Sequence, residues 1–196
     1  MSSPLARPPR TRDRPALFLD RDGTIVRHVD YLVRADQLQL LEGAADAIAR
    51  ARVSGRAVVV VTNQPAVAHG FADEDAVREV HARLADLLDA RGARVDAFYF
   101  CPHHPEAKLE RYRVVCECRK PLPGMLMQAA RALGIELAAS VMIGDRLKDV
   151  GAGARAGCRT VLLGEAGRRP SADGWSEPVP DHVCADLGSA VDWALG

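Results

Sequence analysis

The sequence predicts an α/β fold in which a parallel β-sheet is covered by helices on both faces, a Rossmann-like three-layer sandwich. Short apolar runs alternate with longer segments that carry apolar residues at helical spacing, which is typical of βαβ units. The chain has 196 residues, enough for a single domain with a core of its own. Polar side chains directly follow several apolar runs, at the strand ends where parallel sheets bind ligands.

Each element is predicted from a local pattern. The run at 16–19 is short and wholly apolar, as expected for a buried strand. Leu84, Leu87 and Leu88 have helical spacing within a longer polar segment. The predicted strands are Ala16–Leu19, Ala57–Val61, Val95–Phe100, Ser140–Ile143 and Thr160–Leu163, and the predicted helices lie near Gly43–Val53, Asp73–Arg91, Gly124–Leu133, Asp149–Ala156 and Leu187–Leu195.

The remaining segments define the domain organisation. Residues 1–14 are rich in Pro and Arg and lack an apolar signal core, so we expect a flexible leader, with a targeting role as the alternative. Residues 15–196 form the single predicted domain, and Gly167–Pro180 is expected to be a loop. No insertion is long enough for a large cap domain. The pocket should therefore be open and shaped by the loops His28–Asp36 and Pro65–Ala72.

The charge balance limits the partners. Lys plus Arg and Asp plus Glu each number 26, so the formal net charge is zero, and nucleic acid or an anionic membrane is not expected as a partner. No apolar stretch approaches the ~20 residues that a membrane span requires. We expect a soluble, cytoplasmic, monomeric enzyme that acts on a small molecule.

The first candidate site follows the first predicted strand. Asp20 and Asp22 lie one residue apart where the chain leaves the strand, a pattern suited to a hard divalent cation. One carboxylate can attack while the other handles a proton. Gly23 permits the chain to turn there and the backbone to approach a ligand closely.

Three later segments add groups that bind phosphate or metal. Thr62 and Asn63 end the second apolar run and offer a hydroxyl and an amide to phosphate oxygens. Arg119 and Lys120 precede a proline-marked helix start and can neutralise phosphate charge. Asp145 ends another strand, with Asp149 four residues on as a second acid or as a helix N-cap. Carboxylate, hydroxyl, lysine and carboxylate in this order indicate a phosphate-processing site.

The cysteines predict a second metal site. Cys101, Cys116 and Cys118, with either His103 or His104, make a Cys3His set that suits tetrahedral structural zinc. The spacing is tighter than in most zinc fingers, and the alternative is a set of reduced surface thiols. The odd count of five cysteines disfavours a disulfide scaffold. The other two cysteines, Cys158 and Cys184, are expected to be small packed residues.

Taken together, the motifs resemble the haloacid dehalogenase superfamily of phosphatases, and within it the histidinol-phosphate and heptose-bisphosphate phosphatase group. The resemblance covers all four motifs of the superfamily between Asp20 and Asp149 and rests on these stretches: Asp20-Arg21-Asp22-Gly23-Thr24, Thr62-Asn63-Gln64, Cys101-Pro102-His103-His104-Pro105, Cys116-Glu117-Cys118-Arg119-Lys120-Pro121-Leu122-Pro123-Gly124-Met125 and Gly144-Asp145.

The resemblance implies a mechanism. Asp20 would be the nucleophile that forms an aspartyl-phosphate, and Asp22 the general acid and base. Mg²⁺ would be held by Asp20, the carbonyl of Asp22 and Asp145. The phosphoryl group would be bound by Thr62, Lys120 and the backbone at Arg21. For Asn63 and Arg119 the open alternatives are contact with the rest of the substrate and support of neighbouring residues, and for Asp149 they are holding a Mg²⁺-bound water and orienting Lys120.

The resemblance also implies that Zn²⁺ is held by Cys101, His103, Cys116 and Cys118 in the loop 101–118. The expected reaction is hydrolysis of a heptose 1,7-bisphosphate to the 1-phosphate. The chain carries His69 where the heptose enzymes tend to have an arginine, so histidinol phosphate or another small phosphomonoester is the alternative substrate. A zinc-stabilised, non-catalytic binding module is the remote alternative, and retention of both Asp20 and Asp22 argues against it.

Overall fold

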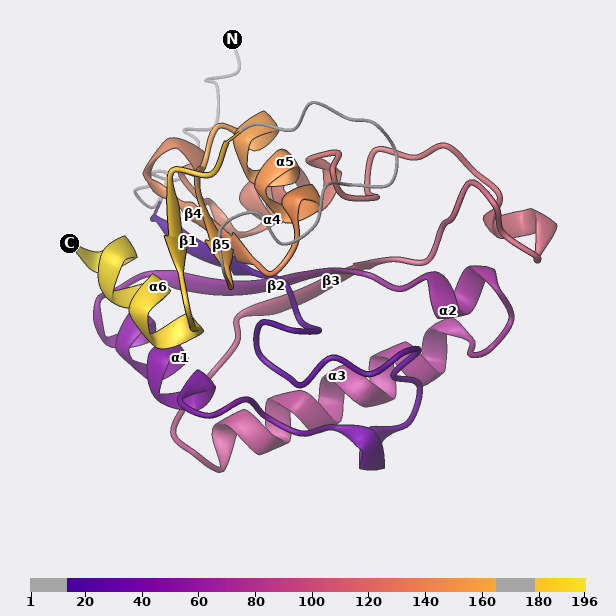
Figure 1. Cartoon of the computed structure of the whole chain (residues 1–196), viewed down its shortest axis with the longest axis horizontal. Coiled ribbons are helices and arrows are strands. Elements are labelled where there is room, and N and C mark those ends of the chain that lie inside the picture. Colours follow the sequence, from indigo (N-terminus) through magenta and orange to yellow (C-terminus); the bar gives the residue numbers. More distant parts are fainter. Residues whose placement is uncertain (1–13, 165–178) are drawn as a thin grey trace, which may run out of the picture.

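The computed structural model describes residues 14–164 and 179–196, and the strands in these ranges form a six-stranded, fully parallel sheet. The spatial order is β3-β2-β1-β4-β5-β6, so β1 is central and the direction of winding reverses beside it (Figure 1). A crevice is expected at the carboxyl ends of the strands at such a reversal. The strands are β1 (Ala16–Leu19), β2 (Ala57–Asn63), β3 (Ala97–Cys101), β4 (Val141–Gly144), β5 (Arg159–Leu163) and β6 (His182–Cys184).

Helices cover both faces, as predicted for a three-layer sandwich. On one face Leu17, Leu19 and Val60 pack in a core with α1, α3 and α6. On the other face Phe18 and Val59 pack with α4 and α5. The helices are α1 (Ala44–Val53), α2 (Pro65–Ala68), α3 (Glu74–Asp89), α4 (Gly124–Leu133), α5 (Leu147–Ala156) and α6 (Leu187–Leu195), with 3₁₀ turns η1 (Ala35–Gln37), η2 (Glu110–Tyr112) and η3 (Leu137–Ala139).

The central strands are apolar because both of their faces are covered. Every residue of β1 and β2 is buried. The register pairs Leu17 with Val58 on one side of β1 and with Val141 on the other. These pairings bring the ends of β1, β2 and β4 to one edge of the sheet, which places their following loops together.

Three predictions about the elements were wrong. The loop predicted at Pro65–Ala72 begins with the short helix α2, because Pro65 occupies a first helical position, where its fixed φ is favourable. Strand β2 continues through Thr62 and Asn63, so these residues end the strand and do not follow it. Strand β6 was not predicted, because only three residues form it.

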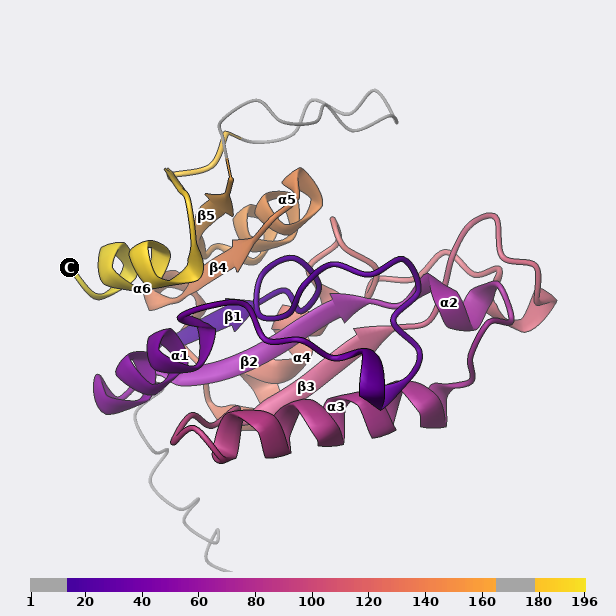
Figure 2. The same ribbon diagram turned by 60° about the horizontal axis from the view of Figure 1, so that its bottom comes forward.

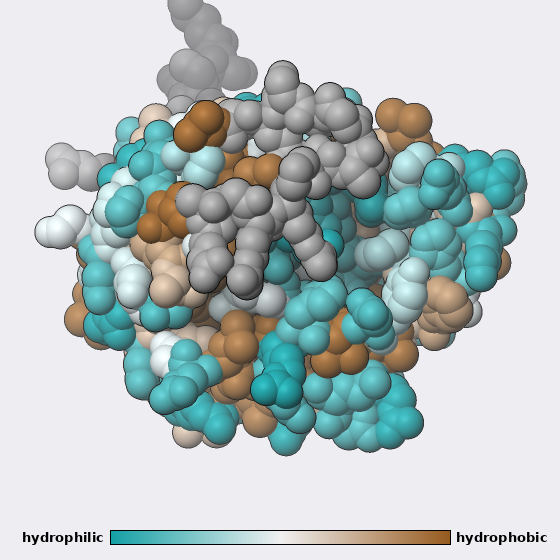
Figure 3. Space-filling view, viewed as in Figure 1, coloured by the Kyte–Doolittle hydropathy of each residue, from teal (hydrophilic) through white to brown (hydrophobic). Residues whose placement is uncertain are grey.

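Two predicted segments lie mostly outside the described residues. Of the predicted leader only Arg14 is described, and most of the predicted loop 167–180 also falls outside. Among the described helices none is long and apolar enough to cross a membrane. On the face shown in Figure 3, apart from the grey atoms, hydrophilic residues are interspersed with smaller hydrophobic patches.

Candidate active site

The predicted site residues converge at the carboxyl edge of the sheet. Asp20 follows β1, Thr62 and Asn63 end β2, and Asp145 follows β4. Figure 2 shows the arrowheads of β2 and β3 pointing toward the side of the molecule where α2 lies. A cavity of about 400 Å³ lies at this edge, lined by Asp20, Asp22, His28, Val29, Asp30, Tyr31, Leu32, Thr62, Asn63, Gln64, Pro65, Ala66, Arg146 and Lys148.

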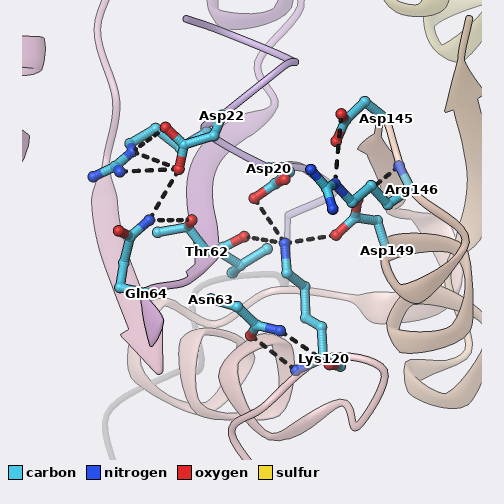
Figure 4. Close-up of polar contacts among 11 residues, drawn as sticks. Asp20, Asp22, Thr62, Asn63, Gln64, Lys120, Asp145, Arg146 and Asp149 are labelled. Carbon is cyan, nitrogen blue, oxygen red and sulfur yellow. Dashed lines mark hydrogen bonds and ion pairs between the residues drawn. The ribbon is translucent and has the colours of Figure 1, made fainter. Parts of the chain in front are cut away.

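Lys120 lies at the centre of the buried part of the site. Its ammonium lies 2.8 Å from Asp20 Oδ1 and 2.6 Å from Asp149 Oδ1, and it donates to the Val61 carbonyl at 2.7 Å. Figure 4 shows the carboxylates of Asp20 and Asp149 converging on this nitrogen. Only 2% of Lys120 is exposed, and Asp149 is fully buried. Two of the three N–H donors of the ammonium are thus used in hydrogen bonds, and its contact with Asp149 is an ion pair.

The charges of this cluster are set by burial and by one another. Burial works to raise the pKa of Asp20, but Lys120 and then Lys148 outweigh it and hold that pKa below its ordinary value. Burial works to lower the pKa of Lys120, and Asp149 and Asp20 outweigh it and raise that pKa. Asp20 is therefore ionised at neutral pH, as a nucleophilic carboxylate must be.

Asp149 has two tasks in the structure. Burial raises its pKa, against the attraction of Lys120. Its Oδ2 accepts a hydrogen bond from the backbone N–H of Arg146 at 3.1 Å, and it occupies the third position of α5, with Arg146 as the N-cap. Asp149 therefore lies three residues beyond the N-cap of α5, and the N-cap role considered for it from the sequence is wrong. A Cβ on Gly144 would lie 2.4 Å from Asp149 Cγ, so only glycine leaves room for this carboxylate.

Asp22 is oriented by two neighbours. The Arg21 guanidinium, which is fully buried, donates from Nη2 to Asp22 Oδ2 at 2.9 Å and from Nε to both oxygens at 3.2 Å. Gln64 Nε2 donates to Asp22 Oδ2 at 3.0 Å and to Thr62 Oγ1 at 2.8 Å. Figure 4 shows Asp22 directed toward Gln64 while Asp20 is directed toward Lys120. The two carboxylates thus have separate partners, as different chemical roles require.

Asn63 supports Lys120 in this structure. Its Nδ2 donates to the Lys120 carbonyl and its Oδ1 accepts from the Lys120 N–H, both at 3.0 Å. The amide is therefore used in both directions by the backbone that carries the ammonium. Of the two alternatives considered from the sequence, this geometry corresponds to support of a neighbouring residue.

Asp145 completes a carboxylate group suited to a metal. Oxygens of Asp20, Asp145 and Asp149 lie within 4.8 Å of one another. Burial, and then repulsion from Asp20 and Asp149, raises the pKa of Asp145 to about 6. Its Oδ1 is buried without a hydrogen-bond partner among the described residues. A Cβ on Gly23, whose φ is +85°, would lie 2.4 Å from Asp145 Oδ2, so glycine is needed for this close approach.

The cavity wall contains cationic residues that the sequence did not single out. Lys148, in the first turn of α5, lines the cavity together with Arg146. The Arg146 Nη2 lies 3.4 Å from His28 Nε2. Burial lowers the pKa of Lys148, with attraction from Asp149 opposing it. The sequence pattern that could have predicted them is Asp145–Asp149, in which two cationic residues lie between two acidic residues.

The cysteine cluster is assembled as predicted. The Cys101 sulfur lies 3.5 Å from that of Cys116 and 3.2 Å from that of Cys118, and His103 Nδ1 lies 3.5 Å from the Cys118 sulfur. All three thiols are free, and contact with Cys101 lowers the pKa of Cys118 to about 5. His103 belongs to this group of ligand atoms, whereas His104 Nδ1 accepts from the Glu106 N–H at 3.1 Å.

Arg119 and the two remaining cysteines complete the predicted residues. Arg119 Nη1 donates to the His103 carbonyl at 2.9 Å, so its guanidinium is attached to the cysteine loop, and it is not among the residues that line the cavity. Cys158 and Cys184 are buried, which confirms that they are packed residues.

Comparisons with known proteins agree with this architecture. Residues 117–190 match the HAD-hydrolase-like family. The D-glycero-β-D-manno-heptose-1,7-bisphosphate 7-phosphatase of Yersinia pestis is 40% identical over 184 residues, which span 92% of this chain and 97% of that protein. The protein of the same name from Escherichia coli K12 is 39% identical over 179 residues, 90% of this chain and 93% of the relative.

Two solved structures share the fold over nearly the whole chain. A HAD-like phosphatase from Mesorhizobium loti has a TM-score of 0.81 and 36% identity, covering 94% of this chain and 87% of that one. The D,D-heptose 1,7-bisphosphate phosphatase of B. bronchiseptica, complexed with magnesium and phosphate, has a TM-score of 0.78 and 34% identity, covering 92% and 98%. The chain therefore belongs to the family of the D-glycero-β-D-manno-heptose-1,7-bisphosphate 7-phosphatases, which are phosphatases of the haloacid dehalogenase superfamily.

Proposed function

We propose that this chain hydrolyses the 7-phosphate of D-glycero-D-manno-heptose 1,7-bisphosphate and releases heptose 1-phosphate. The observation that carries the proposal is the buried Asp20–Lys120–Asp149 cluster, whose Asp20 lines the cavity beside a second, separately oriented carboxylate on Asp22. The activity named for relatives that match this chain over nine-tenths of its length supports the substrate and its β anomer.

In the first half of the reaction a carboxylate oxygen of Asp20 attacks phosphorus and forms an aspartyl-phosphate, while the bond from phosphorus to the C7 oxygen breaks. Asp22 gives a proton to the departing C7 oxygen. In the second half the carboxylate of Asp22 removes a proton from water, and the water oxygen attacks phosphorus, so that phosphate leaves and Asp20 is restored. Thr62 and the backbone at Arg21 bind the phosphoryl oxygens.

The hydrogen bonds to Asp22 bear on its two roles. Arg21 and Gln64 donate to the carboxylate and fix its orientation, and Gln64 also joins it to Thr62. To act as the acid in the first half, Asp22 must carry a proton and turn at least one oxygen away from these donors.

The carboxylate group fits Mg²⁺. Asp20 and Asp145, with the carbonyl of Asp22, are the proposed ligands, and the unpartnered Asp145 Oδ1 and the raised pKa of Asp145 indicate a site that a cation would stabilise. Bound Mg²⁺ would neutralise phosphate charge. The magnesium in the B. bronchiseptica structure supports this assignment.

The cysteine cluster fits Zn²⁺. Three thiol sulfurs and one imidazole nitrogen lie together, and thiolates with imidazole select zinc in preference to magnesium. Cys101, His103, Cys116 and Cys118 fill four positions, as in a structural site. We propose that zinc fixes the loop 101–118 and that Arg119, attached to the His103 carbonyl, meets the retained C1 phosphate.

Comparison of substrates tests the function. Catalytic efficiency is measured with both anomers of heptose 1,7-bisphosphate, with histidinol phosphate and with simple sugar phosphates, and the released phosphate is assigned by ³¹P NMR. We expect the bisphosphate to be preferred and its C7 phosphate to be released. A preference for histidinol phosphate, the alternative suggested by His69, or release of the C1 phosphate would overturn the proposal.

The substitution Asp20→Asn tests whether Asp20 is the nucleophile. It should lower turnover by at least ~10²-fold and leave the fold nearly unchanged, because asparagine has the shape of aspartate and Lys120 keeps its contacts with Asp149 and the Val61 carbonyl. Wild-type turnover in this variant would contradict the aspartyl-phosphate mechanism. Absence of magnesium-dependent phosphate release by the wild-type chain from every phosphomonoester would favour the non-catalytic binding module. A cytoplasmic, monomeric state remains part of the proposal.

A further inference from the structure

The chain contains three lysines, Lys108, Lys120 and Lys148, among 26 basic residues, and two of the three lie at the active site. Lys120 donates hydrogen bonds to Asp20 and to the Val61 carbonyl and forms an ion pair with Asp149. These contacts hold the ammonium against the nucleophile. A second cation at the cavity can therefore share the charge of the phosphoryl group.

Lys148 is the second ammonium at this cavity. It lines the same cavity as Asp20, Asp22 and Thr62. Its charge interacts with Asp20, Asp145 and Asp149, so it lies close to the carboxylates around which the phosphate is transferred. No hydrogen bond or salt bridge joins its side chain to another residue of the ranges 14–164 and 179–196. Lys148 therefore has donors available for a ligand.

Lys148 also lies at a position in its helix where a positive charge is unfavourable. It is the second residue of α5, whose N-cap is Arg146. The amino end of a helix carries partial positive charge and favours acids, so a cation there is unfavourable for the helix itself. Arg146 and Lys148 at this end both line the cavity, where an anionic ligand would meet them.

We propose that Lys148 is a second phosphate-binding residue, which donates to the phosphoryl group that is transferred while Lys120 holds Asp20. The inference rests on the proposed phosphatase function. A lysine acts here as a compact positive charge with three donors, which suits a phosphoryl group whose oxygens gain charge along the reaction. Lys148 would then stabilise the bound phosphate, the transition state and the phosphate product.

Inorganic phosphate and orthovanadate probe this contact without the sugar. At saturating Mg²⁺, calorimetry measures phosphate binding and steady-state kinetics measures the vanadate inhibition constant, for wild type, Lys148→Met and Lys148→Arg. Lys148→Met should weaken both by about 10-fold or more, the effect of losing one charge-assisted hydrogen bond. Lys148→Arg should recover part of the loss, because it keeps the charge. The matched control is Lys108→Met, since Lys108 lies over the Phe71 ring outside the cavity and should bind both ions like wild type.

Substrates with one and two phosphates locate the contact. Lys148→Met should lower kcat/KM by the same factor for heptose 1,7-bisphosphate and for an aryl monophosphate. Unchanged phosphate and vanadate binding would overturn the proposal, and so would a loss confined to the bisphosphate, which would place Lys148 at the retained phosphate. A lower Mg²⁺ requirement with unchanged phosphate binding would also overturn it, because Lys148 would then compete with the metal.

Two further comparisons keep the result interpretable. If Lys148→Met does not fold, as judged by its thermal midpoint, Lys148→Gln is used for the same binding measurements. If wild type hydrolyses the aryl phosphate but not the heptose bisphosphate, the proposed substrate is wrong, whereas the role of Lys148 is still decided by inorganic phosphate and vanadate.

Discussion

Lys120→Met is the substitution whose effect on stability follows most directly from the structure. Methionine has similar length but no charge, so Asp20 and Asp149 would lose their shared cation while 5% and 0% exposed. Breaking a buried ion pair from one side costs about 3–5 kcal/mol in unfolding free energy, because a charge is left buried and uncompensated. Turnover should also fall, by about 10²–10³-fold, because the ammonium that holds the nucleophile is gone.

A second substitution separates these two effects. Asp149→Asn removes the other buried charge and keeps an oxygen for the N–H of Arg146. In the Lys120→Met background it should restore at least half of the lost stability and none of the turnover. Urea unfolding measures this without added Mg²⁺ and without chelator, so that the cysteine site keeps its metal, and Lys108→Met is the control. A loss of unfolding free energy below about 1 kcal/mol for Lys120→Met, or no recovery in the double variant, would show that Lys120 does not compensate the buried charges of Asp20 and Asp149.

Two further predictions concern the zinc site and a buried histidine. Cys116→Ser should lower the zinc content of the purified chain and its thermal midpoint, because binding of a structural metal is also folding energy. Metal analysis checks this, and an absence of zinc from wild type purified without chelator would contradict it. Burial, and then repulsion from Arg21, lowers the pKa of His81 from 6.5 to about 3. Between these values the unfolded chain binds a proton that the folded chain does not, so the unfolding free energy should fall by roughly 2 kcal/mol from pH 7 to pH 5 on account of His81. His81→Leu should reduce this pH dependence by that amount in urea titrations, and equal pH dependence in both proteins would show that His81 is not buried as a neutral group.

The parts of the site that the sequence predicted are those fixed by the main chain. Asp20, Thr62 and Asp145 stand at the ends of apolar runs, and parallel pairing of β1 with β2 and β4 is enough to bring those ends together. The cysteine set was predictable for a similar reason, because few chemistries use three thiols and an imidazole at such close spacing. In each case the type of the residues and their positions in the chain were enough to predict that they lie together.

The parts that the sequence did not predict depend on where side chains point. Gln64 follows two residues with assigned roles, yet its amide joins Thr62 to Asp22, which requires the turn into α2. Arg21 was assigned only a backbone contact with the phosphoryl group, but the structure buries its side chain completely against Asp22. The direction of a side chain at the end of a strand depends on the conformation of the loop that follows. That conformation is set by tertiary contacts, which local sequence patterns do not reveal.

The structure also changes what loss of zinc should do to catalysis. The cysteine loop ends at Cys118, two residues before Lys120, so loss of zinc would displace Lys120 if the loop alone held it. Lys120 is held independently of that loop, however, by two hydrogen bonds between its backbone and the Asn63 side chain and by its own ammonium contacts. Arg119 is anchored to the loop itself, at the His103 carbonyl.

These different anchors separate two kinetic effects of Cys116→Ser. If Arg119 meets the retained phosphate, disorder of the loop should raise KM for the bisphosphate and leave kcat for an aryl monophosphate within a few fold of wild type. Steady-state kinetics on the two substrates at a temperature where the variant remains folded measures this. A large fall in kcat for the monophosphate would contradict this expectation, because it would mean that zinc, and not Asn63, positions Lys120.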